Sequence, residues 1–330
     1  MADQERYRLV TRSDFDGLVC AALLKSRDLI DDIVFAHPKD VQDGKVQIGP
    51  RDITTNLPFA PECHLAFDHH ASETVRLGGP APRNLIIDPK APSAARVVYN
   101  HFGGKDAFPL LSQEMLAAVD KGDSAQFTKE EVLDPQGWVL LNFLMDARTG
   151  LGRFRTFGVS NRQLMMELIE NCWKHDNVDD ILRLPIVAER VTLYREHQEP
   201  SRAQLQRCAK VHANLVVLDL RDEDPIYVAN RFVIYALYPQ CNISLHVLWG
   251  LKKQVTVFAM GKSILNRTSR TNIGTLALSY GGGGHEAAGT CQVENDRAAT
   301  VLGELIQRIT SDGCPSDRGG LRPDGGWCAP

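Results

Sequence analysis

Short apolar runs alternate with segments of helical periodicity through the first third of the chain, and this alternation limits the fold more than any other feature. The apolar runs, each ended by polar residues, are 7–11, 33–36, 63–67 and 85–87. The segments with apolar residues at helical spacing are 18–29, 93–102 and 112–119, the last with Ser112 at its expected N-cap. Alternating strands and helices are typical of a doubly wound, mostly parallel sheet. Ligands bind such sheets beyond the carboxyl ends of the strands, so the residues after each run are the first candidates for function.

The remainder of the chain changes character twice. Residues 162–210 are charged and mostly helical in pattern, with breaks expected at Pro185 and Pro200. Strand-like runs return at 215–220, 226–229, 232–237, 244–248 and 254–259. We therefore expect an N-terminal α/β domain over 1–160, a helical connector over 161–210, a smaller mixed α/β domain over 211–312, and a disordered, Gly/Pro/Asp-rich tail over 313–330.

Composition excludes several classes of protein. The 330 residues are 43% hydrophobic and 24% charged, which is typical of a soluble globular protein. A net charge of −4, from 37 basic and 41 acidic residues, argues against a general nucleic-acid coat. No apolar stretch reaches the ~18 residues of a membrane span, and the polar start does not fit a secretory signal. Eight cysteines without a Cys-x-x-Cys pair predict free thiols, so we expect a cytoplasmic protein without membrane contact.

Two carboxylates, Asp14 and Asp16, follow the first predicted strand, and Gly17 allows a sharp turn into the next helix. Carboxylates that stand one residue apart in a loop can converge on a hard divalent cation. An acidic strand–helix turn, in which one Asp caps the helix, explains the same residues equally well.

A second polar cluster, Asp68, His69 and His70, directly follows the third apolar run. Its oxygen and imidazole groups suit manganese, zinc or iron, and a neighbouring carboxylate can fix the tautomer of an imidazole. We favour a metal site here over a polar surface loop. Asp120 and Asp123 end a predicted helix, where carboxylates oppose the helix dipole. Asp120 is the preferred further ligand of these two, and a solvated turn is the alternative.

The segment Gly281–Gly289 contains four consecutive glycines followed by His-Glu-Ala-Ala-Gly. Glycine backbone can approach a phosphate closely and present several N–H donors to it, whereas a flexible linker is the simpler alternative. We expect a helix to begin at His285 and to contain Ala287 and Ala288. An earlier basic, hydroxyl-rich run can also bind phosphate, with a solvated loop as its alternative, and it contains Lys262, Ser263, Arg267 and Arg270.

The order of these motifs on one chain resembles the DHH phosphoesterase superfamily with its C-terminal DHH-associated domain, and exopolyphosphatase-related proteins in particular. The resemblance covers about residues 7–312. It implies a two-domain hydrolase in which one or two Mn²⁺ or Mg²⁺ ions activate water. This water would cleave phosphoanhydride or phosphodiester bonds in polyphosphate, a short oligonucleotide or a small nucleotide.

The resemblance also assigns a role to each motif residue. The implied metal ligands are Asp14, Asp16, His69 and Asp120. Asp68 and His70 are implied to orient ligands or to contact phosphate as catalytic residues. The implied phosphate clamp, with Arg267 added from the basic run, comprises Lys262, Ser263, Arg267, Gly282, Gly283, Gly284 and His285.

Two positions depart from the family pattern. Arg12 stands where the family usually has a His, and Asn56 stands where it has an Asp that bridges two metal ions, with Asp52 as a rival. Arginine cannot bind a cation, and a neutral amide bridges two cations poorly. We therefore keep Asn56 as a doubtful ligand, expect one ion or a weak second one, and assign Arg12 to gripping the substrate's phosphate. A catalytically weakened nucleotide- or polyphosphate-binding protein is the alternative, and a homodimer is left open.

Overall fold

The computed structural model describes residues 5–175 and 177–312, so the predicted tail lies outside the described residues. The chain divides into two compact units. One holds the residues up to Phe127 and Asp134–Arg195, and the other holds Thr128–Leu133 and the residues from Glu196 onward. The domain limits expected at 160, 210 and 312 stay predictions. No helix among the described residues is long and apolar enough to cross a bilayer.

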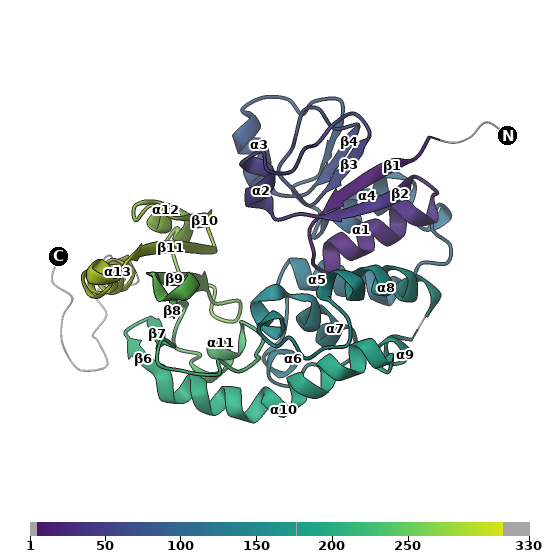
Figure 1. Cartoon of the computed structure of the whole chain (residues 1–330). Helices are drawn as coiled ribbons and strands as arrows, with labels where there is room; N and C mark the ends of the chain where they lie inside the picture. Colours follow the sequence, from purple (N-terminus) through teal and green to yellow (C-terminus); the bar gives the residue numbers. More distant parts are fainter. Residues whose placement is uncertain (1–4, 176, 313–330) are drawn as a thin grey trace. The chain divides into compact units, whose positions relative to one another are not determined.

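The first unit contains a five-stranded parallel sheet in the order β2-β1-β3-β4-β5 (Figure 1). Its strands are β1 (Tyr7–Thr11), β2 (Ile30–Phe35), β3 (Asp52–Thr55), β4 (Leu65–Asp68) and β5 (Leu85–Ile87). The chain runs from β1 to β2 on one side and then continues to β3 on the other side of β1. Doubly wound sheets bind ligands at such a reversal, beyond the carboxyl ends of the strands. The predicted α/β sheet is confirmed.

Helices α1 (Phe15–Ser26) and α4 (Ala94–His101) pack against this sheet, and further helices pack on them. The other helices of the unit are α2 (Pro38–Gln42), α3 (Ala71–Leu77), α5 (Gln113–Asp123), α7 (Gly137–Met145), α8 (Asn161–Lys174) and α9 (Val178–Leu182), with 3₁₀ turns at Gly104–Asp106, Ala147–Thr149 and Leu151–Arg153. Helix α1 packs against α4, α5 and α8 (Figure 1). Ten of its twelve residues are buried, because it is apolar on nearly every side. Ser93 caps α4, and Ser112 caps α5 as predicted.

Helix α10 (Pro185–Cys208) contains the limit between the two units. Pro185 begins this helix, but the break predicted at Pro200 is wrong, because Pro200 lies inside it. Proline has no backbone N–H, so the helix lacks one hydrogen bond there. Side chains before and after Pro200 hold the helix in place through contacts with other segments. The buried Arg190 donates to a carbonyl oxygen ahead of α8, and Gln204 donates to a carboxylate of the second unit.

The second unit contains a six-stranded mixed sheet in the order β10-β11-β9-β8-β7-β6, in which β7 and β8 pair parallel and the other neighbours antiparallel. Its strands are β6 (Ala209–His212), β7 (Leu215–Asp219), β8 (Ile243–Trp249), β9 (Val255–Lys262), β10 (Gly283–His285) and β11 (Ala288–Glu294). Helices α12 (Ile273–Leu278) and α13 (Ala298–Asp312) pack on one face and form the core with it. The unit also contains α6 (Lys129–Leu133), α11 (Val233–Leu237) and 3₁₀ turns at Leu251–Lys253 and Asn295–Arg297. The predicted smaller mixed α/β fold is confirmed.

Three local predictions in this unit are wrong. The run 232–237 contains helix α11 rather than a strand, and 226–229 forms no strand. A short apolar run has no periodicity that separates a helix from a strand. The glycine-rich segment does not begin a helix but forms the β10–β11 hairpin, with His285 opposite Ala288. Backbone pairing along the sheet edge therefore takes the place of the expected helix.

Gly17 is required for the turn from β1 into α1. A Cβ atom there would lie 2.1 Å from the carbonyl oxygen of Arg12 and 2.7 Å from Thr11 Oγ1. We predict that Gly17→Ala lowers the free energy of unfolding by more than ~2 kcal/mol, as overpacking against a rigid backbone does. Gly303→Ala is the control, since a Cβ at this exposed position of α13 meets nothing within 4 Å, and alanine is favoured in helices by ~0.5–1 kcal/mol. Equal midpoints of urea unfolding for the two variants would contradict the prediction.

Candidate functional site

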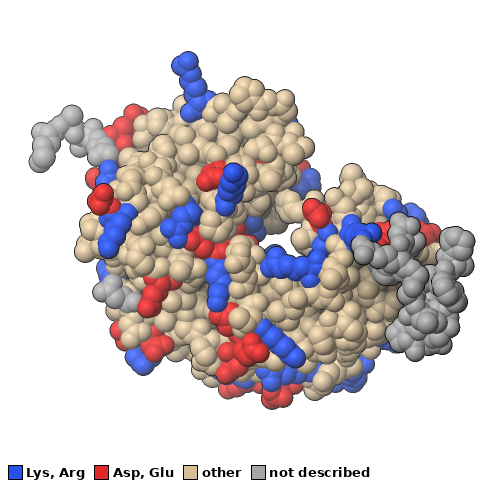
Figure 2. Space-filling view, turned by 180° about the vertical axis from the view of Figure 1, so that it is seen from behind, with Lys and Arg blue, Asp and Glu red and all other residues tan. Residues whose placement is uncertain are grey.

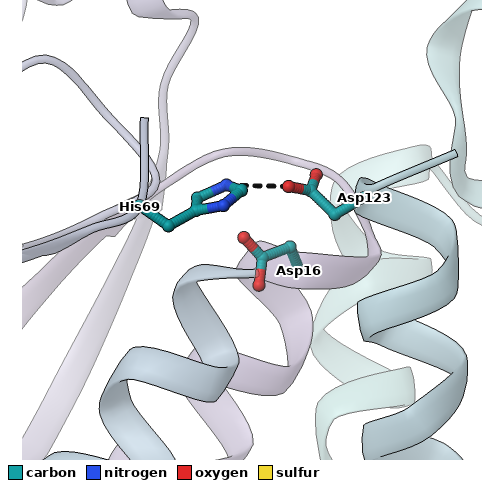
Figure 3. Close-up of side chains that lie close together, drawn as sticks. All are labelled: Asp16, His69 and Asp123. Carbon is teal, nitrogen blue, oxygen red and sulfur yellow. Dashed lines mark ion pairs between the residues drawn. The ribbon is translucent and has the colours of Figure 1, made fainter. Parts of the chain in front are cut away.

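Three side chains that can bind a cation converge at the carboxyl end of the first unit's sheet. Asp16 lies in the first turn of α1, His69 directly follows β4, and Asp123 ends α5. Figure 3 shows the three side chains pointing toward one another. Their ligand atoms all lie within 4.8 Å of one another. The structure thus brings together two of the predicted ligands, Asp16 and His69, with Asp123.

The carboxylate of Asp16 is buried against the first turn of α4. The backbone N–H of Ala94 donates to Oδ2 over 3.0 Å, and that of Ala95 donates to Oδ1 over 2.7 Å. The partial positive charge at the start of α4 stabilises the ionised form. Burial, and then repulsion by Asp123 and Asp14, nevertheless raises the pKa of Asp16 well above its usual value. A nearby cation would stabilise the ionised form of this carboxylate and oppose the rise in its pKa.

His69 is oriented by two partners. Its Nδ1 lies 3.1 Å from the carbonyl oxygen of Ala91, and Nδ1 carries the proton because only an N–H can donate to a carbonyl. Its Nε2 lies 2.8 Å from Oδ2 of Asp123, which is an ion-pair distance without hydrogen-bond geometry. Burial alone would lower the pKa of His69, but the Asp123 and Asp16 carboxylates outweigh it and raise this pKa to about 9. Burial would likewise raise the pKa of Asp123, but His69 lowers it.

This donor set fits a divalent cation. Carboxylates suit Mg²⁺ and Mn²⁺, and imidazole suits iron, nickel, copper and zinc. The carbonyl behind His69 and the α4 amides behind Asp16 correspond to the outer partners that orient ligands in metal proteins. Without a cation, a protonated His69 balances part of the negative charge, whereas a bound cation requires His69 to be neutral.

Asp120 is not a member of this group, although the sequence pattern favoured it over Asp123. Its Oδ1 accepts a hydrogen bond from Ser93 Oγ over 2.7 Å, and its Oδ2 accepts one from Arg96 Nε over 2.9 Å. Asp123 stands four residues after the buried Val119, but Asp120 likewise stands four residues after the buried Leu116. Helical periodicity therefore does not distinguish the two carboxylates, and the contacts of the folded helix are needed to identify Asp123. The assignment of Asp120 as a ligand stays a prediction.

Asp14 caps α1 and pairs with Arg12. Its Oδ1 accepts a hydrogen bond from the backbone N–H of Gly17 over 3.0 Å, and its Oδ2 lies 3.1 Å from Arg12 Nε. Burial raises the pKa of Asp14, and the guanidinium of Arg12 opposes this rise. The capping alternative is realised, and ligation by Asp14 stays a prediction. Arg148, which no sequence motif marked, also acts electrostatically on Asp14 and Asp123.

Asp68 holds the ring of His70 in place. Its Oδ1 lies 2.7 Å from His70 Nδ1, and the Asp68 side chain is almost fully buried. The rings of His69 and His70 lie 4.5 Å apart between centroids. The predicted orienting role of Asp68 therefore has a contact to support it, whereas the catalytic roles of Asp68 and His70 stay predictions.

Asn56 follows β3, which lies between β1 and β4 in the sheet. Its backbone is left-handed, with a φ of 55°, and both polar atoms of its amide are buried without a hydrogen-bond partner in the described part of the chain. A buried amide in this state requires a water, an ion or a ligand. Asn56 therefore stays a candidate. Its rival Asp52 begins β3 at the opposite end of the strand, where Arg8 binds both of its carboxylate oxygens.

The predicted phosphate-binding residues of the second unit gather at one end of its sheet. Lys262 ends β9, and its Nζ lies 3.0 Å from Oε1 of Glu286 in the turn of the β10–β11 hairpin. Ser263 is buried, and its Oγ accepts a hydrogen bond from the backbone N–H of Asn266 over 2.9 Å. This contact gives Ser263 a role in the turn. Arg267 is exposed.

The glycines of this hairpin are needed for different reasons. A Cβ atom at Gly282 would lie 2.1 Å from the carbonyl oxygen of Thr290, and one at Gly284 would lie 2.2 Å from that of Ala288. Both glycines are therefore required for the hairpin to close. A Cβ atom at Gly283 would meet nothing within 4 Å, so packing does not require glycine there.

The last predicted member of the phosphate clamp, His285, lies on the surface. His285 ends β10 and is exposed, as Gly283 is. On the face of the molecule drawn in Figure 2, Lys and Arg side chains are interspersed with Asp and Glu. The described basic side chains on this face therefore form no broad patch, in agreement with the net charge of −4, and phosphate binding by Lys262 stays a prediction.

A solved structure resembles the chain over nearly its whole length. No protein-family model and no curated protein matches the chain. Among solved structures, the pGpG-specific phosphodiesterase PggH from Vibrio cholerae is 61% identical to it, with a TM-score of 0.81. The match covers 93% of this chain and 100% of that chain.

Two more distant structures share the fold. An exopolyphosphatase-related protein from Bacteroides fragilis is 16% identical, with a TM-score of 0.51 over 93% of each chain. RecJ from Thermus thermophilus, in complex with Mn²⁺, is 15% identical, with a TM-score of 0.53 over 93% of this chain and 52% of RecJ. The similarity to PggH confirms the family that the sequence motifs indicated. The chain belongs to the DHH phosphoesterase superfamily and is a phosphoesterase enzyme.

Proposed function

We propose that this phosphoesterase is a divalent-metal-dependent phosphodiesterase with the linear dinucleotide pGpG as its substrate. The observation that carries the proposal is the convergence of Asp16, His69 and Asp123 in a chain 61% identical to the pGpG-specific phosphodiesterase PggH. Polyphosphate, which the family resemblance also implied, is the comparison substrate. The proposed cytoplasmic location fits the free thiols of all six cysteines among the described residues.

The cation would be held by Asp16, His69 and Asp123. When bound, Mn²⁺ or Mg²⁺ supplies a Lewis acid that makes water a stronger nucleophile near neutral pH. The chain's own residues prepare the ligands for this chemistry. The amides of α4 keep the Asp16 carboxylate oriented, and the Ala91 carbonyl keeps the proton of His69 on Nδ1, so that Nε2 offers its lone pair.

Positive side chains beside the carboxylates would bind the scissile phosphate. Arg12 and Arg148 both act electrostatically on Asp14, and a guanidinium forms strong, charge-assisted hydrogen bonds with phosphate oxygens. His70, held by Asp68, would contact the phosphate in a fixed orientation. In the second unit, the open edge of the glycine hairpin and the nearby lysine would bind an anionic group of the substrate.

Turnover assays of the purified protein with Mn²⁺ test this proposal. We expect release of GMP from pGpG, weaker or no release of phosphate from polyphosphate, and loss of activity when a chelator removes the metal. Tight binding of pGpG without turnover would instead support the alternative considered because of Arg12 and Asn56. In that alternative, the chain is a nucleotide-binding protein with weakened catalysis. Turnover of polyphosphate without hydrolysis of pGpG would overturn the assigned substrate.

Each side chain of the cluster is predicted to be essential for cation binding. Asp16→Asn, His69→Ala and Asp123→Asn should each weaken Mn²⁺ binding by more than about 100-fold, because loss of a mere outer partner already costs about 10–100-fold. Asp106→Asn, in an exposed 3₁₀ turn, should leave the affinity unchanged. Isothermal titration of the metal-free protein measures both effects. Wild-type affinity in Asp123→Asn would return the assignment to Asp120.

The pKa of His69 predicts how cation binding depends on pH. An imidazole binds a cation only in its neutral form. Although burial opposes the shift, Asp123 and Asp16 raise the pKa of His69 to about 9, so the metal-free protein holds this proton at neutral pH and releases it on binding. The Mn²⁺ affinity should therefore rise about tenfold per pH unit between roughly pH 6 and 8. Titration in buffers of different ionisation enthalpy counts the released protons, and an affinity that stays constant over this range would refute the prediction.

Gly283→Val separates substrate binding from folding in the second unit. Apart from the two chain neighbours, no atom of the described residues lies within 4 Å of a Cβ atom at this position, so stability should change little. A side chain on the open edge of β10 should obstruct a phosphate and raise the KM for pGpG about tenfold, which corresponds to ~1.4 kcal/mol. Gly282→Ala is the complementary variant, because its Cβ atom would collide with Thr290 and lower stability. An unchanged KM in folded Gly283→Val would mean that the hairpin has only a structural role.

A further inference from the structure

We propose that Asp120 is a positioning residue for the cation site: it holds the first turn of α4, and that turn holds the carboxylate of Asp16. The proposal rests on the proposed function, because it takes Asp16 as a ligand of the cation. Asp120 acts here through Ser93 and Arg96 rather than by the direct ligation that the family resemblance implied. The contacts run without a gap from α5 through α4 to α1.

The carboxylate of Asp16 is the end of this series of contacts, and both of its oxygens are engaged. The backbone N–H groups of Ala94 and Ala95, the first two of α4, donate to one oxygen each over 3.0 and 2.7 Å. Asp16 is only 2% exposed, so solvent does not compete with these amides. Oδ1 also accepts a weak hydrogen bond from the thiol of Cys20 over 4.0 Å, whereas Oδ2 keeps a second lone pair. The amides therefore set the direction of the carboxylate and leave it able to bind a cation.

Ser93 fixes the turn that carries the two amides. It is the fully buried N-cap of α4, and its Oγ accepts a hydrogen bond from the backbone N–H of Arg96 over 3.0 Å. The same Oγ donates its proton to Oδ1 of Asp120 over 2.7 Å. A hydroxyl has one proton to donate, and a carboxylate accepts it more strongly than a neutral group does. The orientation of the cap thus depends on Asp120.

Arg96 gives Asp120 a second attachment to α4. Its Nε donates to Oδ2 of Asp120 over 2.9 Å, and its Nη2 contacts the same oxygen. The side chains of Arg96 and Asp120 are 27% and 15% exposed, so solvent and salt screen this pair only in part. Helix α5, which carries Asp120, ends at Asp123. One helix therefore supplies one member of the cluster directly and orients another, Asp16, through α4.

Asp120→Ala tests the positioning role, with Asp52→Ala as its matched control. Asp52 is a buried carboxylate that likewise pairs with one arginine, Arg8, but it lies at the amino end of the same sheet. Both variants should lose stability, measured by thermal unfolding. Only Asp120→Ala should weaken Mn²⁺ binding by the folded, metal-free protein, by about 10–100-fold in isothermal titration. Equal Mn²⁺ affinities in the two variants would overturn the proposal.

Ser93→Ala distinguishes positioning from direct ligation, because it removes the cap and leaves the Asp120 carboxylate in place. We expect a loss of Mn²⁺ affinity of about tenfold, restored in Ser93→Thr, which keeps the hydroxyl. Wild-type affinity in Ser93→Ala beside a loss in Asp120→Ala would overturn positioning in favour of direct ligation. The two Ser93 variants decide the question if Asp120→Ala does not fold.

A measurement without metal separates this proposal from the proposed function. In the metal-free protein, hydrogen exchange of the Ala94 and Ala95 amides should be faster in Asp120→Ala than in wild type, and unchanged in Asp52→Ala. Protection of these two amides that is equal in Asp120→Ala and wild type would overturn the link from Asp120 to α4. Failure of the wild-type protein to bind Mn²⁺ would refute the proposed function instead.

Discussion

The buried carboxylate of Asp16 is the constraint on which the arrangement of the first unit depends. An ionised carboxylate away from water is costly unless hydrogen bonds and opposite charge compensate it. Helix α4 supplies two amides and its partial positive charge, and His69 supplies a positive charge when protonated. This compensation is incomplete, because the pKa of Asp16 is still raised. The uncompensated negative charge of Asp16 favours binding of a cation. The same charge is costly in the metal-free fold, so the site would gain its function from a carboxylate that lowers stability when no cation is bound.

Compared with the family pattern, Arg12 and Asn56 leave less negative charge at the carboxyl ends of β1 and β3. Arg12 pairs with Asp14 and so balances one carboxylate charge beside the cluster. Asn56 offers a neutral amide where the family pattern has a carboxylate. With less negative charge to balance, the site has less attraction for a second cation. We therefore favour one bound cation, with the guanidinium of Arg12 supplying fixed positive charge for the substrate's phosphate.

The alternation of apolar runs predicted four of the five strands of the first unit, because strands of a covered parallel sheet are continuous apolar runs. It missed β3, which has the sequence Asp-Ile-Thr-Thr and is therefore no apolar run. The predicted run 85–87 is β5 residue for residue. The same criterion failed for 232–237, which is equally apolar but contains a helix. There the hydroxyl of Tyr235 bonds Ser244 and the carbonyl of Gly261, which belong to two strands of the sheet. Helix α11 is thus held by contacts to strands that lie later in the sequence, and the local sequence pattern alone could not predict it.

The candidate site was predictable to the extent that strand ends define it, because Asp16 and His69, which both follow strands, do lie close together. Their role as metal ligands stays a prediction. Asp120 and Asp123 are less than one helical turn apart, and the packing of α5 decides which of them reaches His69. The glycine motif has a similar division. Gly282 and Gly284 are needed to close a hairpin, whereas Gly283 has no such need. The motif resemblance assigns phosphate binding to all three glycines. Their surroundings show that the fold requires glycine at two of these positions, whereas at Gly283 it leaves space that a ligand could occupy.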